Sequence, residues 1–215
     1  MLSALVPKRC FVGKRHLEEA VKTVKDAVFE VNWKPFFLNP TLPDGTKIPL
    51  VQYITEKYGA AAGESIKSGK GGLSKAGQAV GITFTSGRYV VNSLKSHCLL
   101  DYAATVDKQN EVAESLFHRY FENAEDINSM ATLEDVAKDS GLNLESAMKH
   151  VGDPAIANKI KEEAEGARIQ GVSGVPSFEV YLKGENVGTY PSFSGAQPPA
   201  TFVSIFQRLL KNAKM

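Results

Sequence analysis

Apolar residues near the start of the chain recur at the spacing of an α-helix. From Phe11 onward, one face of this helix carries Leu17, Ala20, Val21, Val24 and Val28. Over residues 29–35 the period changes to two, as in a strand that buries one face. A turn cluster at residues 39–45 ends that strand. A first strand ahead of the helix would have to lie in residues 2–6, so it is very short or missing.

The middle of the chain is dominated by helical periodicity. Between about Pro49 and Arg168, the strand pattern is limited to a short candidate at residues 82–84. The predicted helices span residues 50–58, 66–80, 91–106, 110–121, 133–140, 144–151 and 155–169. Because Phe117, Tyr120 and Phe121 are apolar residues at helical spacing, we expect them to be largely buried. This segment should form a helical cap over one end of a small sheet.

Strand periodicity returns near the end of the chain, in residues 175–183. A turn at residues 184–186 predicts a hairpin to residues 187–190, and the proline pair Pro198-Pro199 opens a last helix over residues 200–211. We therefore expect a discontinuous α/β domain formed by residues 1–48 and 169–215. A helical insertion domain, residues 49–168, would interrupt it.

Composition and charge narrow the classes of partner. Lysine and arginine number 25 and aspartate and glutamate 24, so the formal net charge is +1, and no nucleic acid or anionic membrane surface is expected as a partner. A hydrophobic content of 43% without a long apolar run predicts a soluble globular chain with no membrane span. The histidines do not stand at metal-ligand spacing from the cysteines, so no metal site is predicted.

The N-terminal residues bear on the compartment. The first fifteen residues hold Lys8, Arg9, Lys14 and Arg15 and no acid, and their apolar part is too short for a secretory signal. We expect a cytoplasmic protein, with a basic mitochondrial presequence as the alternative.

The chain has two cysteines, Cys10 and Cys98, so no disulfide framework holds it together. Cys98 falls on an apolar helical stripe and is expected in the core, although a Cys10–Cys98 disulfide remains open. His97 could face a site and orient a thiol, or be a surface or capping histidine. The four basic residues around Cys10 would each favour its thiolate.

The stretch Gly171-Val172-Ser173-Gly174-Val175-Pro176-Ser177-Phe178 places a proline at the start of a strand. A proline there removes a hydrogen-bond donor from the ladder. We expect a cis Val175–Pro176 bond that flanks a thiol and leaves neighbouring backbone free to pair with an extended substrate. The alternative is a trans proline on an edge strand.

Four blocks together resemble the FrnE-type branch of the DsbA family. They are Cys10-Phe11-Val12-Gly13-Lys14-Arg15, Phe37-Leu38-Asn39-Pro40, Leu116-Phe117 through Tyr120-Phe121 with Asp126-Ile127, and Gly174-Val175-Pro176-Ser177-Phe178 with Phe193-Ser194-Gly195-Ala196-Gln197. The resemblance implies a thioredoxin fold with a large all-helical insertion, here with its first strand short or missing. Members of the family that this chain resembles are thiol–disulfide oxidoreductases, and kappa-class glutathione transferases and 2-hydroxychromene-2-carboxylate isomerases are more distant relatives.

One block departs from the family pattern. Members usually have Cys-Pro-Trp-Cys before Phe-Val-Gly-Lys, whereas this chain has Pro7-Lys8-Arg9-Cys10, so Pro7 stands in the place of the attacking cysteine. The resemblance implies that Cys10 is catalytic and that Val175 and Pro176 flank the substrate. It also implies that Asn39 and Ser194-Gly195-Ala196-Gln197 line the far end. An incomplete N-terminus is one hypothesis for the departure, and an upstream Cys-x-x-Cys would support it.

Three functions follow from these residues and stay open. The first is a thiol–disulfide oxidoreductase, impaired by the loss of the thiol at Pro7, acting on a peptide or glutathione. The second is a glutathione-dependent transferase or isomerase that uses a bound thiolate. The third is a non-catalytic protein that keeps the groove for a thiol or peptide. None of the three calls for a cofactor, although glutathione could be a co-substrate.

Overall fold

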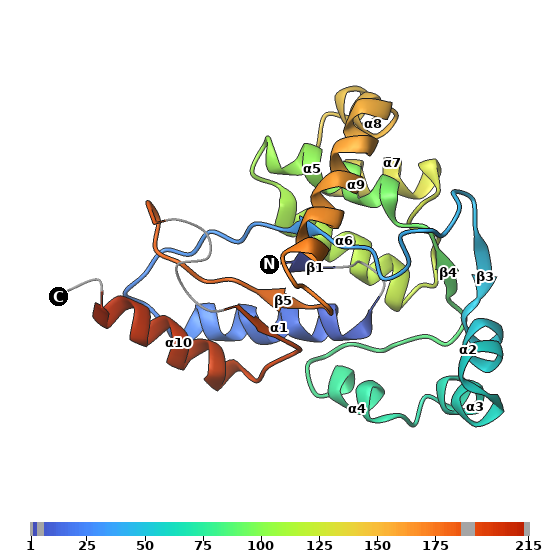
Figure 1. Cartoon of the computed structure of the whole chain (residues 1–215), viewed down its shortest axis with the longest axis horizontal. Helices are drawn as coiled ribbons and strands as arrows, with labels where there is room; N and C mark the ends of the chain where they lie inside the picture. Colours follow the sequence, from blue (N-terminus) through green and yellow to red (C-terminus); the bar gives the residue numbers. More distant parts are fainter. Residues whose placement is uncertain (1, 4–6, 186–191, 213–215) are drawn as a thin grey trace.

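The computed structural model describes residues 2–3, 7–185 and 192–212 (Figure 1). Its helices are α1 (Lys8–Thr23), α2 (Leu50–Tyr58), α3 (Ala60–Ser68), α4 (Gly72–Gln78), α5 (Leu94–Ala104), α6 (Gln109–Phe121), α7 (Met130–Asp139), α8 (Leu144–Val151), α9 (Pro154–Ile169) and α10 (Pro199–Asn212). Its strands are β1 (Leu2–Ser3), β2 (Lys34–Pro35), β3 (Lys47–Pro49), β4 (Tyr89–Val91), β5 (Ser177–Phe178) and β6 (Phe193–Ser194).

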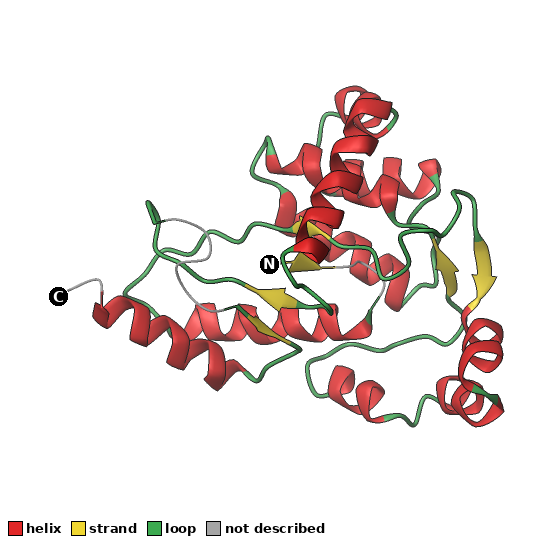
Figure 2. Cartoon of the chain, viewed as in Figure 1, coloured by secondary structure: helices red, strands yellow, loops and turns green. Residues whose placement is uncertain are grey.

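A small mixed sheet has the strand order β2-β1-β5-β6. Strand β1 runs parallel to β2 and antiparallel to β5, and β5 pairs antiparallel with β6, with Phe178 opposite Phe193. In Figure 2, α1 and α10 lie along one side of this sheet and the helices α5 to α9 gather on the other side. The structure is therefore a thioredoxin fold with a large helical part, and its first strand is short.

Several sequence predictions of element bounds were wrong. The segment 66–80 is divided between α3 and α4, because Gly69 ends α3 in the left-handed conformation (φ +64°). Residues 82–84 form no strand, whereas β4 occupies the start of the helix predicted from residue 91 and pairs with β3. The strands predicted at 29–35 and 175–183 shrink to β2 and β5. The hairpin predicted to residues 187–190 lies outside the described residues.

Helix α1 also ends earlier than its apolar pattern predicts. It stops at Thr23, and Val28 is fully exposed at 101%. None of the described helices is long and apolar enough to cross a membrane.

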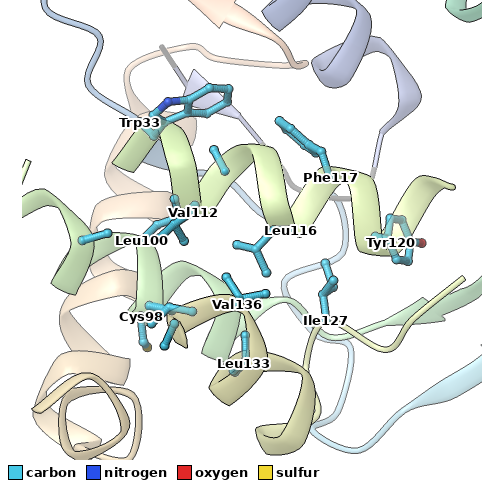
Figure 3. Close-up of a cluster of buried hydrophobic side chains, with 14 of the residues drawn as sticks. Trp33, Cys98, Leu100, Val112, Leu116, Phe117, Tyr120, Ile127, Leu133 and Val136 are labelled. Carbon is cyan, nitrogen blue, oxygen red and sulfur yellow. The ribbon is translucent and has the colours of Figure 1, made fainter. Parts of the chain in front are cut away.

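The main core joins α1 to the helices of the middle segment. Phe117, Tyr120 and Phe121 are buried, which confirms their predicted burial. Phe11 of α1 stacks on Phe117 with ring centroids 5.2 Å apart, and the Trp33 indole meets Phe117 edge-on at 5.7 Å. Figure 3 shows Trp33 and Phe117 together at the edge of this cluster. Because the cluster crosses the boundary at residues 48 and 49, the division into two domains stays a proposal.

Gly13 allows a close approach between α1 and the loop before β5. A methyl group added at Gly13 would lie 3.1 Å from Cγ of Pro176 and 3.3 Å from Cζ of Phe178. Both neighbours are buried, and the Pro176 carbonyl accepts a hydrogen bond from the Gly195 N–H at 2.8 Å. The proline ring therefore has little freedom to move away.

His97 lies in the core, contrary to both the site-facing and the surface interpretations. It is 3% exposed, its ring hydrogen-bonds to the backbone of Phe36, and its Nε2 has no hydrogen-bond partner among the described residues. Burial lowers the pKa of His97 to about 3, and the hydrogen bond that the ring N–H donates to the Phe36 backbone raises it only in part. The ring is therefore neutral at physiological pH.

We expect Gly13→Ala to lower the free energy of unfolding by about 1 kcal/mol or more, because overpacking of about 1–3 kcal/mol exceeds the gain in helix propensity. The matched control is Gly166→Ala in α9, where an added methyl group meets nothing within 4 Å. That change should raise the free energy of unfolding by about 0.5–1 kcal/mol. Urea unfolding of the two variants checks this, and equal effects would show that the approach at Gly13 is not tight.

The second prediction concerns pH. His97 has a lower pKa in the folded state than the 6.5 of an unfolded histidine, so between those values the unfolded chain binds more protons and stability rises with pH. Its contribution should be present above pH 6.5 and should fall by up to about 1.4 kcal/mol per pH unit toward pH 3. His97→Asn should remove this slope. Denaturant unfolding between pH 7 and 4 measures it, and identical slopes in the two proteins would contradict the assignment.

Candidate functional site

The candidate site begins at the first turn of α1. Pro7 is the N-cap residue of this helix, has extended backbone angles (φ −78°, ψ 128°) and offers no side-chain cap. The N–H of Cys10 donates to the Pro7 carbonyl at 2.9 Å. Pro7 is half-buried, whereas Cys10 is fully buried, at 0% exposed, within the main core. The position nearer to solvent therefore carries no thiol.

Two cations stand beside this turn without a carboxylate partner among the described residues. Lys8 is half-buried, with Nζ 3.3 Å from the Ser74 hydroxyl and 4.6 Å from the centre of the Phe84 ring. Burial, and then the charge of Arg88, lowers the pKa of Lys8 to about 8. Arg88 is 3% exposed and its guanidinium lies over the Tyr120 and Phe121 rings. With the helix dipole, this charge favours an anion such as a thiolate at the start of α1.

The next turn of α1 carries cations that are neutralised. Lys14 and Arg15 both pair with Glu18 and with Glu114 of α6, at 2.6 Å for Lys14 to Glu114 and 3.0 Å for Arg15 to Glu18. Burial would raise the pKa of Glu114, but its hydrogen bonds and charge contacts with Arg15 and Lys14 outweigh burial and lower that pKa. Lys14 and Arg15 therefore favour a thiolate at Cys10 less than the sequence alone predicts.

The loop before β5 and the segment after β6 meet α1. The Val175–Pro176 bond is cis. Through Gly13, α1 approaches both Pro176 and Ala196, whose Cα would be 3.7 Å from a methyl group there. The Nδ1–H of His16 donates to the Gln197 carbonyl at 2.8 Å. Pro176, Ala196 and Gln197 thus gather beside the second turn of α1.

Hydrogen bonds within the segment after β6 fix its conformation. The side-chain amide of Gln197 donates to the Ser194 carbonyl at 2.8 Å, and its backbone N–H donates to the Gly195 carbonyl at 2.8 Å. Val175 is half-buried and packs against Phe36 and Ala167. The sequence-predicted residues of this loop and segment therefore stand in one neighbourhood.

Asn39 lies elsewhere. It is exposed, its Oδ1 accepts a hydrogen bond from the Thr41 hydroxyl at 2.9 Å, and it lines a cavity of about 580 Å³. None of the other sequence-predicted site residues lines that cavity.

Cys98 lies on α5 and is buried in the main core, as its helical stripe predicts, and Figure 3 shows it among apolar side chains. Burial, followed by the charge of Asp101, raises the pKa of Cys98 to about 11. No disulfide joins Cys10 and Cys98. Among the described residues, no group of three or more candidate ligands could hold a metal ion.

Sequence reasoning missed several residues of this region as contributors. Gly13 and His16 lie three and six residues after Cys10 on the same helix, so close packing of that helix on another segment could have suggested them. Arg88 gave no signal, because single cations in loops are usually solvated.

The chain is similar to a known protein family in sequence and to several solved proteins in structure. Residues 9–207 match the sequence profile of the DSBA-like thioredoxin domain. No curated protein matches the chain by sequence. A "probable DsbA oxidoreductase" from Streptomyces coelicolor has a similar solved structure, with a TM-score of 0.84 and 23% identity over 98% of this chain and 88% of that chain.

A 2-hydroxychromene-2-carboxylate isomerase is also similar in structure, with a TM-score of 0.67 and 14% identity over 99% of this chain and 96% of that one. At these identities the two structures show a shared fold. The family profile spans nearly the whole chain, and the chain therefore belongs to the DSBA-like thioredoxin domain family.

Proposed function

We propose that this chain is a thiol–disulfide exchange protein of the DsbA/FrnE type that works with one thiol, Cys10, instead of two. One observation carries the proposal: the half-buried cap position of α1 is a proline, and the cysteine three residues later is fully buried. The site thus keeps the place of the resolving thiol and lacks the attacking one.

A two-thiol enzyme releases its substrate when the second thiol attacks the mixed disulfide made by the first. Pro7 has no sulfur, and it also lacks the N–H that would help to bind an anion at the helix start. Cys98 is a poor substitute, because its raised pKa of about 11 keeps it protonated at neutral pH. An external thiol must therefore complete the exchange.

Glutathione is the co-reactant that we propose for this step. After local opening of the first turn of α1, the Cys10 thiolate attacks a disulfide between glutathione and a peptide. The substrate S–S bond breaks, a bond between Cys10 and the glutathione sulfur forms, and the departing peptide thiolate takes a proton. A second glutathione thiolate then attacks the mixed disulfide, which yields glutathione disulfide and returns Cys10 as a thiolate.

The surroundings support this assignment. Lys8 lies in the first turn of α1 and Arg88 acts on it through its charge, and neither has a carboxylate partner among the described residues, so both favour a thiolate at this turn. The Val175–Pro176 loop lies beside α1, where the substrate backbone could pair in extended form. We place the protein in the cytoplasm as part of this proposal, because glutathione keeps thiols reduced there.

A second candidate is a glutathione-dependent transferase or isomerase. The same two cations favour it, because they could stabilise the thiolate of a bound glutathione where the protein has no accessible thiol of its own. Catalysis that survives Cys10→Ser would identify this second function. Glutathione binding without any turnover would identify a non-catalytic protein.

We expect the chain to show little or no two-thiol activity in insulin reduction or in oxidation of a reduced protein. Its glutathione-dependent reduction of a peptide–glutathione disulfide should be measurable and lost in Cys10→Ser. Pro7→Cys should raise insulin reduction at least about tenfold, since a thiol at the helix start has a lowered pKa and a resolving partner in Cys10.

Cys98→Ser is the matched control for these assays, because it removes a buried thiol away from the first turn of α1 and should leave every rate unchanged. Strong insulin reduction by the unaltered chain that persists in Cys98→Ser would show that a single thiol is not the limit on this protein.

A further inference from the structure

The cavity that Asn39 lines is not used by the thiol chemistry. It lies between residues 37–42, α2, residues 90–94 and the last turns of α9, elements that are labelled or coloured in Figure 1. Its volume of about 580 Å³ falls within the range in which proteins bind small organic molecules. Its described lining does not include Cys10, Pro176 or the segment 194–197.

Most of the wall is apolar. Leucine, isoleucine, valine and aromatic side chains line it, among them Leu42, Leu50, Ile54 and Val91. Two large apolar side chains of the same wall stay exposed, Leu38 at 55% and Tyr58 at 63%. A wall of this kind favours the apolar body of a ligand, because binding removes that surface from water.

The charges of the lining are unbalanced. Three cations, Lys57, Lys161 and Arg168, face one carboxylate, Glu165. No described carboxylate forms a salt bridge with any of the three cations. In a nearly neutral chain, this leaves a local excess of positive charge at an apolar hollow.

Arg168 is the cation best fixed in place. It is half-buried, its guanidinium lies 5.0 Å over the Phe36 ring, and one N–H donates to the Phe37 carbonyl. A cation in the last turn of α9 also suits the helix dipole, but that preference does not require it to line a cavity. A guanidinium has five N–H donors in a fork that matches a carboxylate, and the described residues accept from one of them.

We propose that this cavity binds an amphipathic monocarboxylate, with its apolar body against the wall formed by α2 and residues 90–94 and its carboxylate on Arg168. The exposed amide of Asn39 is a further donor at the cavity. The proposal does not depend on the reactivity of Cys10, because the two regions share no lining residue.

Isothermal titration of the full chain with sodium decanoate, 2-naphthoate and decanol tests this. At least one of the two carboxylates should bind one-to-one, and decanol should bind about tenfold or more weakly, because it lacks the charge-assisted hydrogen bonds. Tighter binding of decanoate assigns an aliphatic ligand, and tighter binding of 2-naphthoate assigns an aromatic one. Absence of binding by both carboxylates would overturn the proposal.

Arg168→Gln should weaken the binding of the carboxylate about tenfold or more. The matched control is Arg208→Gln, an exposed arginine on α10 outside the cavity, which should leave affinity unchanged. Because Arg168→Gln also loses contacts to Phe36 and Phe37, Ile54→Trp is the second variant. It fills the cavity without altering a charge and should abolish binding while circular dichroism stays native. Unchanged affinity in a folded Ile54→Trp would place the ligand elsewhere.

Discussion

Helix α1 is packed on two faces at once, and this double packing determines where the sulfur of Cys10 can lie. Its first turns put Cys10, Phe11 and Val12 into the core shared with α5 to α8, while Leu17 and Ala20 enter a second cluster with Phe202 and Phe206 of α10. A helix held by both ends cannot rotate about its axis without losing one of the two clusters. Cys10 is therefore buried as long as the first turn of α1 is closed, and the half-buried cap position belongs to Pro7.

The same packing determines which basic residues on and near α1 are paired with carboxylates. Lys14 and Arg15 reach Glu114 of α6, so their charges are compensated. Lys8 and Arg88 lie against aromatic rings and have no described carboxylate partner, so the positive potential concentrates at the start of the helix. Close approach at Gly13 brings the cis-proline loop to the neighbouring turn. Under the proposed function, thiolate stabilisation and substrate placement would therefore both fall at the start of α1.

Periodicity and turn residues predicted much of the fold and less of the site. The long helices were predictable because their apolar stripes repeat over several turns, and α2 and α8 have the predicted bounds. Strands of two residues, such as β2 and β5, cannot be bounded by alternation, since pairing decides where they end. The pairing of Lys14 with Glu114 and the place of Arg168 beside Phe37 depend on segments about a hundred residues or more apart, so no local pattern could reveal them.

The proposed function assigns thiol–disulfide exchange to one sulfur, that of Cys10, and the products of native oxidation test this most directly. Incubation of the folded protein with excess glutathione disulfide, followed by intact-mass and peptide analysis, identifies which sulfur reacts and with what. The account predicts one glutathione adduct per chain, located at Cys10, with Cys98 remaining a free thiol. An internal Cys10–Cys98 disulfide, or an adduct at Cys98 with Cys10 unmodified, would contradict it.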